Sequence, residues 1–305
     1  MSGEPAISII TAVFNRLDLT RKYLADLEQT LPGLPIEVIL VDDGSSDGTR
    51  EYLGSIQSPH LKIIFNEQNR GFAGANNRGV EQAEAPRLAF LNNDLVLKSG
   101  WLEPMLRALE EPGTGFVGNV QTNAHHGRID HAGIVFTPWG IPEHYGMDYL
   151  YLPKNGVKEF RAVTAACCLI EKEVFLSVDG FDESYRNGFE DIDLCLRLEQ
   201  KGFRNKVALG SRVGHWVSSS PGRKEKDDPN RQLFLSRWGL KASEWGKRDW
   251  PRHYLWRHLR RPWKLNGTKT LDALTRLFRP GKELSPWMKR KWDESIRNIP
   301  AKGSK

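Results

Sequence analysis

The sequence has no long hydrophobic run. No stretch of about 18 consecutive apolar residues occurs, so we expect no membrane-spanning helix. The first residues, Met1-Ser2-Gly3-Glu4-Pro5, lack the basic and apolar regions of a signal peptide. These two absences predict a cytoplasmic protein.

Cysteine is also scarce. The three cysteines are Cys167, Cys168 and Cys195, and all three lie among apolar neighbours. This placement favours buried thiols in a reducing compartment over disulfides or a zinc site. Internal repeats and low-complexity segments are absent from the first 240 residues.

What the chain does contain is enough apolar material for a core and an uneven distribution of charge. Its 305 residues are 39% hydrophobic and 10% aromatic, which suits one large or two ordinary domains. Residues 241–305 carry 18 Lys or Arg against 6 Asp or Glu, and they hold six of the ten tryptophans. The first 240 residues carry 26 Lys or Arg against 32 Asp or Glu. We therefore predict two units, a domain at 1–240 and a basic, Trp-rich extension at 241–305.

Short apolar runs alternate with segments of helical periodicity along the first unit. The runs predict strands at 7–13, 36–41, 61–65, 87–91, 115–120, 163–170 and 203–209. The periodic segments predict helices at 17–27, 49–56, 71–80, 101–109 with Ser99 as its cap, 173–178 and from 190 onward. Residues 121–160 indicate a loop with hairpin content. Alternation at this spacing requires crossover connections, so we expect an α/β fold whose central sheet is mostly parallel, with helices on both faces.

Polar clusters follow several of the predicted strands. Asp42 and Asp43 follow the second strand, and Asn92-Asn93-Asp94 follows the fourth. In an open parallel sheet such strand ends share one edge, where ligands bind, so these residues are expected to line one cleft. A carboxylate beside two amides offers hard oxygen ligands to a divalent cation. Taken alone, the triplet favours an ordinary turn over a site.

The predicted helix from residue 190 places one acid on its apolar face. Asp191 has Leu194, Cys195 and Leu198 at i+3, i+4 and i+7, so it is expected to face inward. By the same count Asp193 lies on the outer face, where Arg197 follows at i+4. An inward acid is suited to act as a general base, although any acid at a helix start also favours the helix dipole.

Histidines and glycines leave alternatives open. His215 follows a strand and is either a metal ligand or a core histidine. His125, His126 and His131 lie in a loop of Gly, Arg and Asp, which favours solvated side chains over a metal site. The small-residue segment at 71–79 has no nucleotide-binding loop motif, but a helix amino end there would favour a phosphate.

Six segments together resemble the motifs of family 2 glycosyltransferases, in the same order and over roughly residues 6–220. They are Ile9–Arg16, Val41–Thr49, Asn69–Gly79, Phe90–Asp94, Gly180–Glu183 and Phe189–Leu194. Within that family the sequence is similar to the bacterial rhamnosyltransferase-like branch that builds polysaccharides.

The resemblance implies a GT-A fold and a nucleoside-diphosphate-sugar donor, a UDP- or dTDP-sugar. By this resemblance Thr11, Ala12 and Asp43 would contact the nucleotide, Asp43 through the base. Asn76 would also belong to the donor site, although many family members have arginine at that position.

The resemblance further implies a divalent metal, Mn or Mg, and inversion at the anomeric carbon. Asn92 and Asp94 stand at the two ends of the family's Asp-x-Asp motif, with Asn93 between them on the donor side. Asp94 and His215 would hold the metal, and Asp191 would deprotonate the acceptor. Asn92 departs from the usual aspartate, which removes one negative charge near the nucleotide.

The basic extension favours two interpretations equally. Its Trp and Lys/Arg clusters suit an interfacial helix on an anionic membrane, and they also suit a helical extension whose tryptophans pack on the first domain. Without a recognisable binding motif, nucleic acid is not expected as a partner.

The function expected from the sequence is metal-assisted, inverting sugar transfer to a glycan or lipid-linked acceptor on the cytoplasmic side. Under the membrane interpretation of 241–305, the extension adds a peripheral membrane contact. The alternative from another class is an inactive sugar-nucleotide-binding module with a basic interaction tail. An enzyme that forms nucleotide sugars is disfavoured, because the Gly-rich basic loop expected near the amino end is absent.

Overall fold

A computed structural model describes residues 4–31, 33–147, 149, 151–216, 223–259 and 261–297. Its first half contains β1 (Ile7–Val13), α1 (Leu17–Thr30), β2 (Ile36–Asp42), α2 (Thr49–Ser55), β3 (Leu61–Phe65), α3 (Gly71–Glu81), β4 (Arg87–Leu91), β5 (Leu95–Val96), α4 (Glu103–Leu109) and β6 (Thr114–Asn123). There follow β7 (Ile129–His131), β8 (Ile134–Phe136), β9 (Pro142–His144), β10 (Val157–Phe160), β11 (Cys167–Glu171), α5 (Lys172–Leu176), α6 (Glu190–Gln200) and β12 (Arg204–His215). The C-terminal helices are α7 (Arg223–Leu259), the short 3₁₀ helix η1 (Pro262–Lys264), α8 (Gly267–Phe278) and α9 (Pro286–Ile296).

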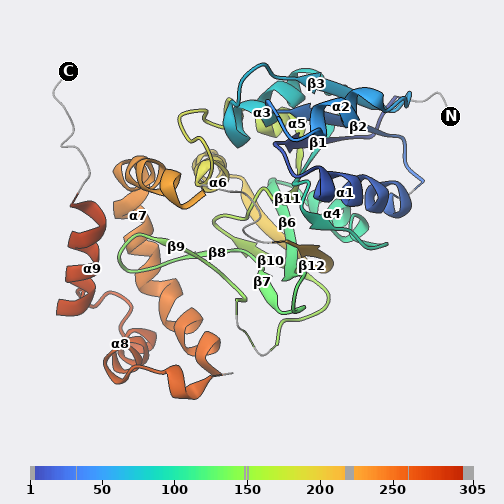
Figure 1. The fold of residues 1–305 in the computed structure, drawn as a ribbon. Coiled ribbons are helices and arrows are strands. Elements are labelled where there is room, and N and C mark those ends of the chain that lie inside the picture. Colours follow the sequence, from blue (N-terminus) through green and yellow to red (C-terminus); the bar gives the residue numbers. More distant parts are fainter. Residues whose placement is uncertain are drawn as a thin grey trace.

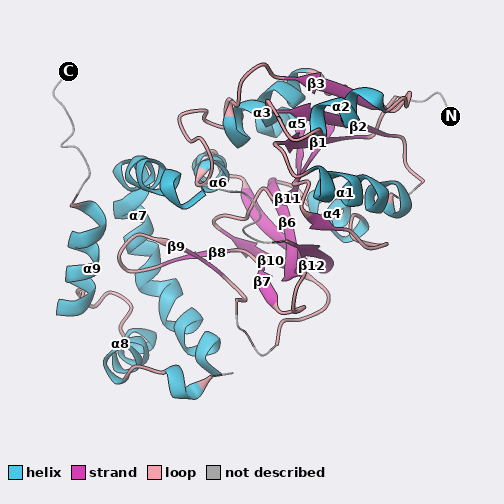
Figure 2. Cartoon of the chain, in the orientation of Figure 1, coloured by secondary structure: helices cyan, strands magenta, loops and turns pink. Residues whose placement is uncertain are grey.

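One large sheet organises the chain (Figure 1). Its strands lie in the order β10-β12-β6-β11-β4-β1-β2-β3, with β5 paired to β12 and β7 to β6. Neighbours β3, β2, β1 and β4 are all parallel, as the alternation of strands and helices predicted. Strand β1 is almost entirely buried, as expected for a central parallel strand covered on both faces (Figure 2).

The other half of the sheet is mixed. Strand β11 runs antiparallel to β4 on one side and to β6 on the other, while β6 and β12 are parallel. Because β11 is reversed, its amino end lies at the edge where the parallel strands end. The hairpin expected in residues 121–160 is β8–β9, which forms a separate two-stranded sheet against α7.

Two local predictions were wrong. Helix α4 begins at Glu103 with Leu102 at its cap, so Ser99 does not cap it. Strand β11 begins at Cys167, four residues later than predicted, because residues 163–166 form an irregular segment. This segment lies at the functional edge described below.

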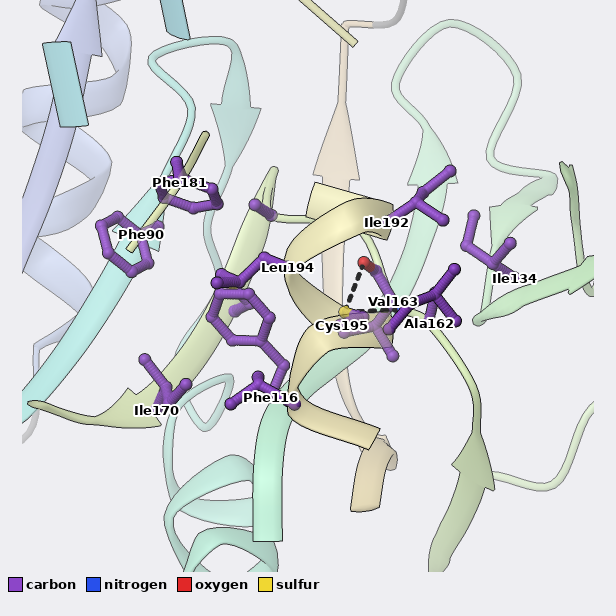
Figure 3. Packing of buried hydrophobic residues seen from close by; sticks show 14 of the residues in the cluster. Phe90, Phe116, Ile134, Ala162, Val163, Ile170, Phe181, Ile192, Leu194 and Cys195 are labelled. Atoms are coloured by element: carbon purple, nitrogen blue, oxygen red, sulfur yellow. Dashed lines mark hydrogen bonds between the residues drawn. The ribbon is translucent and has the colours of Figure 1, made fainter. Parts of the chain in front are cut away.

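The main core lies between the sheet and α6. Phe90 packs against Phe116 and Phe181 with ring centroids 6.2 and 5.0 Å apart (Figure 3). In the same cluster the Cys195 thiol donates a hydrogen bond to the carbonyl oxygen of Val163 at 3.6 Å. All three cysteines are free and buried, as predicted. Burial raises the pKa of Cys167 to about 12, so this thiol stays protonated.

Helix α7 continues through residue 240, where the sequence suggested a boundary between two units. Several residues of α7 pack directly on the rest of the domain. The ring of Trp245 packs on Phe136, and Ser243 Oγ donates a hydrogen bond to the carbonyl of Pro138 at 2.6 Å. Helices α8 and α9 then lie beside α7, away from the large sheet (Figure 1). The division at 240 stays a prediction. Among the described helices, none combines the length and apolar character that spanning a membrane requires.

Candidate active site

Four strands and one helix bring the predicted site residues to one edge of the sheet. Strands β1, β2, β4 and β12 end there, and α6 begins there. The irregular segment before β11 reaches the same edge because β11 is antiparallel to β4. The edge therefore collects the polar residues that follow strands widely separated in sequence.

The triplet after β4 is held in place from both sides. The Asn92 amide donates to the carbonyl of Ala166 at 2.9 Å, and the Trp216 amide donates to the carbonyl of Asp94 at 3.0 Å. Between them, Asn93 Nδ2 donates to Thr20 Oγ1 at 2.9 Å. These bonds turn the Asn93 amide toward α1 and fix the backbone on both sides of it.

Asp94 and His215 form a pair. Asp94 Oδ1 lies 3.0 Å from His215 Nε2, and each side chain is 12% exposed. Strand β5 pairs with the end of β12, which places Leu95 opposite His215 and so holds the two side chains together. A carboxylate oxygen and an imidazole nitrogen are ligands that Mn or Mg accepts, and the remaining positions suit diphosphate oxygens and water. The pair therefore fits a divalent ion, although no cluster of three or more such ligands occurs in the described part of the chain.

Asp191 lies in the first turn of α6. Its Oδ2 accepts a hydrogen bond from the amide of Ala165 at 3.1 Å, and its Oδ1 accepts one from the amide of Ile192 at 2.8 Å. The carboxylate is half-buried, in agreement with the inward placement that the helical spacing predicted. Through Ala165 and Ala166 the same short segment contacts both Asp191 and Asn92, so it fixes the relation between the base candidate and the triplet.

Backbone strain occurs immediately before this helix. Phe189, the residue before Glu190, has φ of +74°, a conformation that bulky side chains rarely adopt. Its ring packs on Phe234 of α7 with centroids 5.1 Å apart. Packing therefore stabilises a backbone shape that the local sequence disfavours, next to Asp191.

The prediction that Asp193 lies on an outer face was wrong. Its ion pair with Arg197 exists, at 2.7 Å, but the carboxylate is buried. Helix α7 covers it: Trp238 Nε1 donates to Asp193 Oδ1 at 2.8 Å, and Arg237 lies 3.5 Å away. The helical count could not reveal this, because the covering residues come from about 45 positions later.

Asp43 organises the part of the edge between β2 and α3. Its carboxylate accepts hydrogen bonds from Asn66 Nδ2 at 2.7 Å and from the amides of Arg70 and Gly71, both at 2.9 Å. Gly71 has φ of +76°, and a Cβ there would lie 2.2 Å from the carbonyl oxygen of Arg186. Asp43 thus binds the first turn of α3, and that turn touches the loop that leads to α6.

Three other predicted donor-site residues differ in how far their side chains are exposed. Thr11 is buried, and its hydroxyl contacts the Tyr23 hydroxyl at 2.7 Å. Asn76 is also buried and donates to the carbonyl of Phe72 at 2.8 Å. Ala12 is partly exposed at the end of β1. The side chains of Thr11 and Asn76 are therefore not exposed at the edge of the sheet.

One of the histidines expected in a solvated loop is buried instead. His131 is 1% exposed, and its Nδ1 lies 3.1 Å from Nδ1 of His144. Burial is the main cause that holds the pKa of His131 well below its usual value, and repulsion from His144 and His215 adds to it. His125 packs edge-on against Trp216, and the amide of Arg128 donates to His126 Nδ1 at 3.3 Å.

Two loops at this edge make a contact that the sequence did not predict. The amide of Asn15 donates to Ser45 Oγ, and Asn15 Oδ1 accepts from the amide of Ser46, both at 2.8 Å. Asn15 also has a positive φ of 57°. The Phe-Asn-Arg turn after β1 was a possible signal for it, since asparagine tolerates this conformation and bonds nearby backbone.

Solved structures with a similar fold define the fold class. The chain aligns with GalNAc-T7 crystallised with UDP, GalNAc and Mn²⁺ at a TM-score of 0.62 and 16% identity, covering 98% of this chain and 59% of that one. It also aligns with mannosyltransferase PcManGT from Pyrobaculum calidifontis, in complex with GDP-Man and Mn²⁺. The TM-score is 0.56, the sequence identity is 15%, and the alignment covers 99% of this chain and 82% of that one. The predicted GT-A fold is confirmed.

Sequence relatives then give the family. Residues 8–175, more than half of the chain, match the family described as Glycosyl transferase family 2, and the chain belongs to this family. It is 31% identical to an uncharacterized protein, y4gI, of Sinorhizobium fredii over 269 residues, 83% of this chain and 28% of the relative. It is 29% identical to the O-antigen biosynthesis protein RfbC of Myxococcus xanthus, over 77% of this chain and 19% of the relative. The chain therefore spans less than a third of either relative's length. The narrower resemblance to a rhamnosyltransferase-like branch stays a prediction.

Proposed function

We propose that this chain transfers a sugar from a nucleoside-diphosphate sugar to an acceptor hydroxyl, with inversion at the anomeric carbon. The observation that carries this proposal is the placement of Asp191 and of the Asp94–His215 pair at one sheet edge. A base and a cation site at one edge are what a displacement with an anionic leaving group requires. Family membership and the GT-A fold support the same conclusion.

In this proposal Asp191 accepts the proton of the acceptor hydroxyl as the acceptor oxygen bonds to the anomeric carbon. The bond from that carbon to the diphosphate breaks on the opposite face, and the nucleoside diphosphate leaves with the electron pair. A divalent ion held by Asp94 and His215 would neutralise the charge on the departing diphosphate. The bonds from Ala165 and Ile192 orient the carboxylate while it stays half-buried.

The nucleotide is proposed to lie beside Asp43, with Ala12 at the end of β1 and Asn92 at the end of β4 as neighbours. Asp43 also has a structural part, because it binds the first turn of α3. Contacts from Thr11, Asn76 and Asn93 stay predictions. The donor is proposed as a UDP- or dTDP-sugar, the metal as Mn or Mg, and the acceptor as a glycan or lipid-linked sugar.

The second candidate is a binding module that retains the donor but does not transfer it. Asn92, which replaces an acid of the family motif, is the feature that favours this alternative. Intact Asp94, His215 and Asp191 favour transfer. The two candidates make different predictions for the Asp191 variant described next.

Asp191→Asn tests the proposed base. The amide oxygen can still accept the hydrogen bond from Ala165, so the fold and donor binding should persist while transfer falls by about 10²–10⁴-fold. Donor binding is measured as the rise in thermal midpoint with a panel of nucleoside-diphosphate sugars plus Mn or Mg. Turnover is measured with the donor that gives the largest rise.

Glu173→Gln, which neutralises an exposed acid in α5, is the matched control and should leave both measurements unchanged. If Asp191→Asn turns over at the wild-type rate, Asp191 is not the base. If the wild-type chain binds donors but shows no transfer to any acceptor or to water, the binding-module alternative holds.

A further inference from the structure

Helix α8 has polar residues inside and apolar residues outside. Asp272 and Arg276 are buried, with Arg276 only 1% exposed. On the opposite side of the helix Leu271, Leu274 and Phe278 are exposed, Leu271 at 68% and Phe278 at 85%. A helix that faces water shows the reverse distribution. We name the exposed row of Leu271, Leu274 and Phe278 the outer face of α8.

Hydrogen bonds hold this inverted orientation. Arg276 donates to the carbonyl oxygens of Lys282 and Glu283 at 2.8 and 2.7 Å. Trp287 Nε1 donates to the Asp272 carboxylate. Turning the outer face inward would break these bonds, because Asp272 and Arg276 would then face away from Trp287 and from the carbonyls of Lys282 and Glu283. The outward position of the leucines is therefore built into the packing of α8 on its neighbours.

The apolar surface continues into the segment before α8. Trp263 in η1 is 77% exposed, and Leu265, just before the helix, is exposed as well. Both η1 and α8 lie at the end of the helical region that points away from the large sheet (Figure 1). Soluble surfaces rarely present several large apolar side chains together, and such groups mark a docking surface.

Positive charge surrounds this surface. Between residues 261 and 282 the only acidic residue is Asp272, which is buried. A hollow of about 370 Å³ between α8 and α9 is lined by Leu271, by Asp272, whose carboxylate accepts a hydrogen bond from Trp287, and by the basic residues Lys282 and Arg290. The exposed basic residues of the segment are Lys264, Lys269, Arg279 and Lys282.

We propose that the outer face of α8, together with Trp263, docks on an anionic lipid surface. Leucine and phenylalanine would enter the boundary of the acyl region, tryptophan would lie at the headgroup level, and the lysines and arginine would meet lipid phosphates. A second copy of the chain fits less well. A twofold contact through this face would bring the same basic residues opposite each other, and like charges repel.

The inference goes beyond the proposed function and does not depend on it. Vesicle binding is measured without donor or acceptor, so a chain that fails to transfer sugar can still bind lipid, and the reverse also holds. If both are true, the surface places the catalytic domain where a lipid-linked acceptor would be reached.

The test is co-sedimentation of the full chain with vesicles. One set contains phosphatidylcholine with a third of phosphatidylglycerol, and the other contains phosphatidylcholine alone. The chain should sediment with the anionic set at low salt and much less with the neutral set or at about 0.5 M NaCl, where charges are screened within a few ångströms. A chain that stays in the supernatant with anionic vesicles at low salt overturns the proposal.

Variants of the outer face separate this surface from nonspecific attraction. Leu271→Ser with Leu274→Ser and Phe278→Ser should lower the vesicle partition constant more than about tenfold, because the lipid contact loses three apolar side chains. Leu176→Ser with Leu240→Ser, which alters exposed leucines outside the surface, should bind like the wild type. Equal binding by the outer-face variant overturns the proposal. So does a wild-type dimer that the outer-face variant loses, because a second copy would then cover the face.

A charge variant keeps the test decisive if the serine variant folds poorly. Reversing three basic residues of the surface should lower binding to anionic vesicles by at least about tenfold. The same change in net charge made elsewhere should have a much smaller effect, and equal effects of the two sets would overturn the proposed orientation. The surface set is Lys264→Glu, Arg279→Glu and Lys282→Glu, and the control set is Lys22→Glu, Lys98→Glu and Arg107→Glu, all at exposed positions.

Discussion

At the scale of single residues, Asn92 and Asn93 are neighbours with the same side chain and different surroundings. Asn93 donates to Thr20, whereas the Asn92 side chain occupies the first position of the Asn92–Asp94 motif. We expect Asn92→Asp to lower the concentration of Mn²⁺ that half-saturates the donor-dependent thermal shift by about tenfold, or about 1.4 kcal/mol, because it adds a carboxylate near Asp94.

Asn93→Asp is the control with the same change in charge. Its side chain is directed to α1, so the metal dependence should change little. If both variants shift the metal dependence equally, the effect is one of general charge and Asn92 has no special position. If Asn92→Asp has no effect, Asn92 does not lie beside the metal.

The two acids of α6 show what residue spacing can and cannot predict. The inward position of Asp191 followed from its apolar neighbours at i+3, i+4 and i+7, and the structure confirms it. The same count placed Asp193 on the outer face of α6, but Trp238 of α7 covers its carboxylate. Helical periodicity describes only one element, and burial also depends on whatever packs against that element from elsewhere in the chain.

At the scale of elements, the start of α3 connects Asp43, beside which the nucleotide is proposed to lie, to the loop before α6. Gly71→Ala should lower stability by more than 1 kcal/mol and weaken donor binding, because its φ is positive and its Cβ would meet the carbonyl of Arg186 at 2.2 Å. Urea unfolding and the donor thermal shift measure the two effects.

Gly202→Ala separates the two causes. Gly202 also has a positive φ, of 91°, but nothing lies within 4 Å of a Cβ at that position. It should therefore show the cost of backbone strain without a loss of donor binding. Equal loss of donor binding in both variants would contradict the proposed link through Gly71.

Most elements of the catalytic domain were predictable, since each is specified by its own periodicity and by the turn that follows it. The direction of β11 was not, because a buried apolar strand has the same pattern whether it is parallel or antiparallel. Its reversal nevertheless matters to the site: it brings Ala165 and Ala166 to the edge, where they bind Asp191 and Asn92. The sequence motifs identified Asp191 and Asn92, but they did not identify the segment at 163–166 that contacts both.

At the scale of the whole molecule, α7 joins the two regions that charge and tryptophan content had separated. Composition changes near residue 240, but packing does not: Trp238 and Trp245 contact the catalytic domain from either side of that position. The tryptophans of the extension consequently have different surroundings. Trp250 is buried beside Trp139, as a packed extension requires, whereas Trp263 is exposed, and membrane contact in that part of the extension stays a proposal.

One group of charged residues predicts that the attachment of α7 depends on pH. Glu143 of β9 lies 3.4 Å from His253 Nε2 and 3.9 Å from Arg257, both in α7. Burial by itself would raise the pKa of Glu143, but the neighbouring imidazole of His253 and the charges of Arg257 and Lys269 outweigh it and lower the pKa. A carboxylate with a lowered folded-state pKa stabilises the fold above its unfolded-state pKa of about 4.3, and this stabilisation disappears as the pH falls through the folded value.

Glu143→Gln should therefore cost about 1 kcal/mol of unfolding free energy at pH 6 to 7, and the difference from the wild type should shrink as the pH falls below about 4. Urea unfolding across this range measures it. Glu159→Gln is the control, because its pair with Arg204 is solvent-exposed and contributes little. A difference that is the same at pH 7 and pH 3.5 would show that Glu143 acts through packing rather than charge. If the predicted pH dependence is found, the contact between β9 and α7 is electrostatic, and acidification should loosen α7 before it disturbs the buried sheet, whose contacts are mainly apolar.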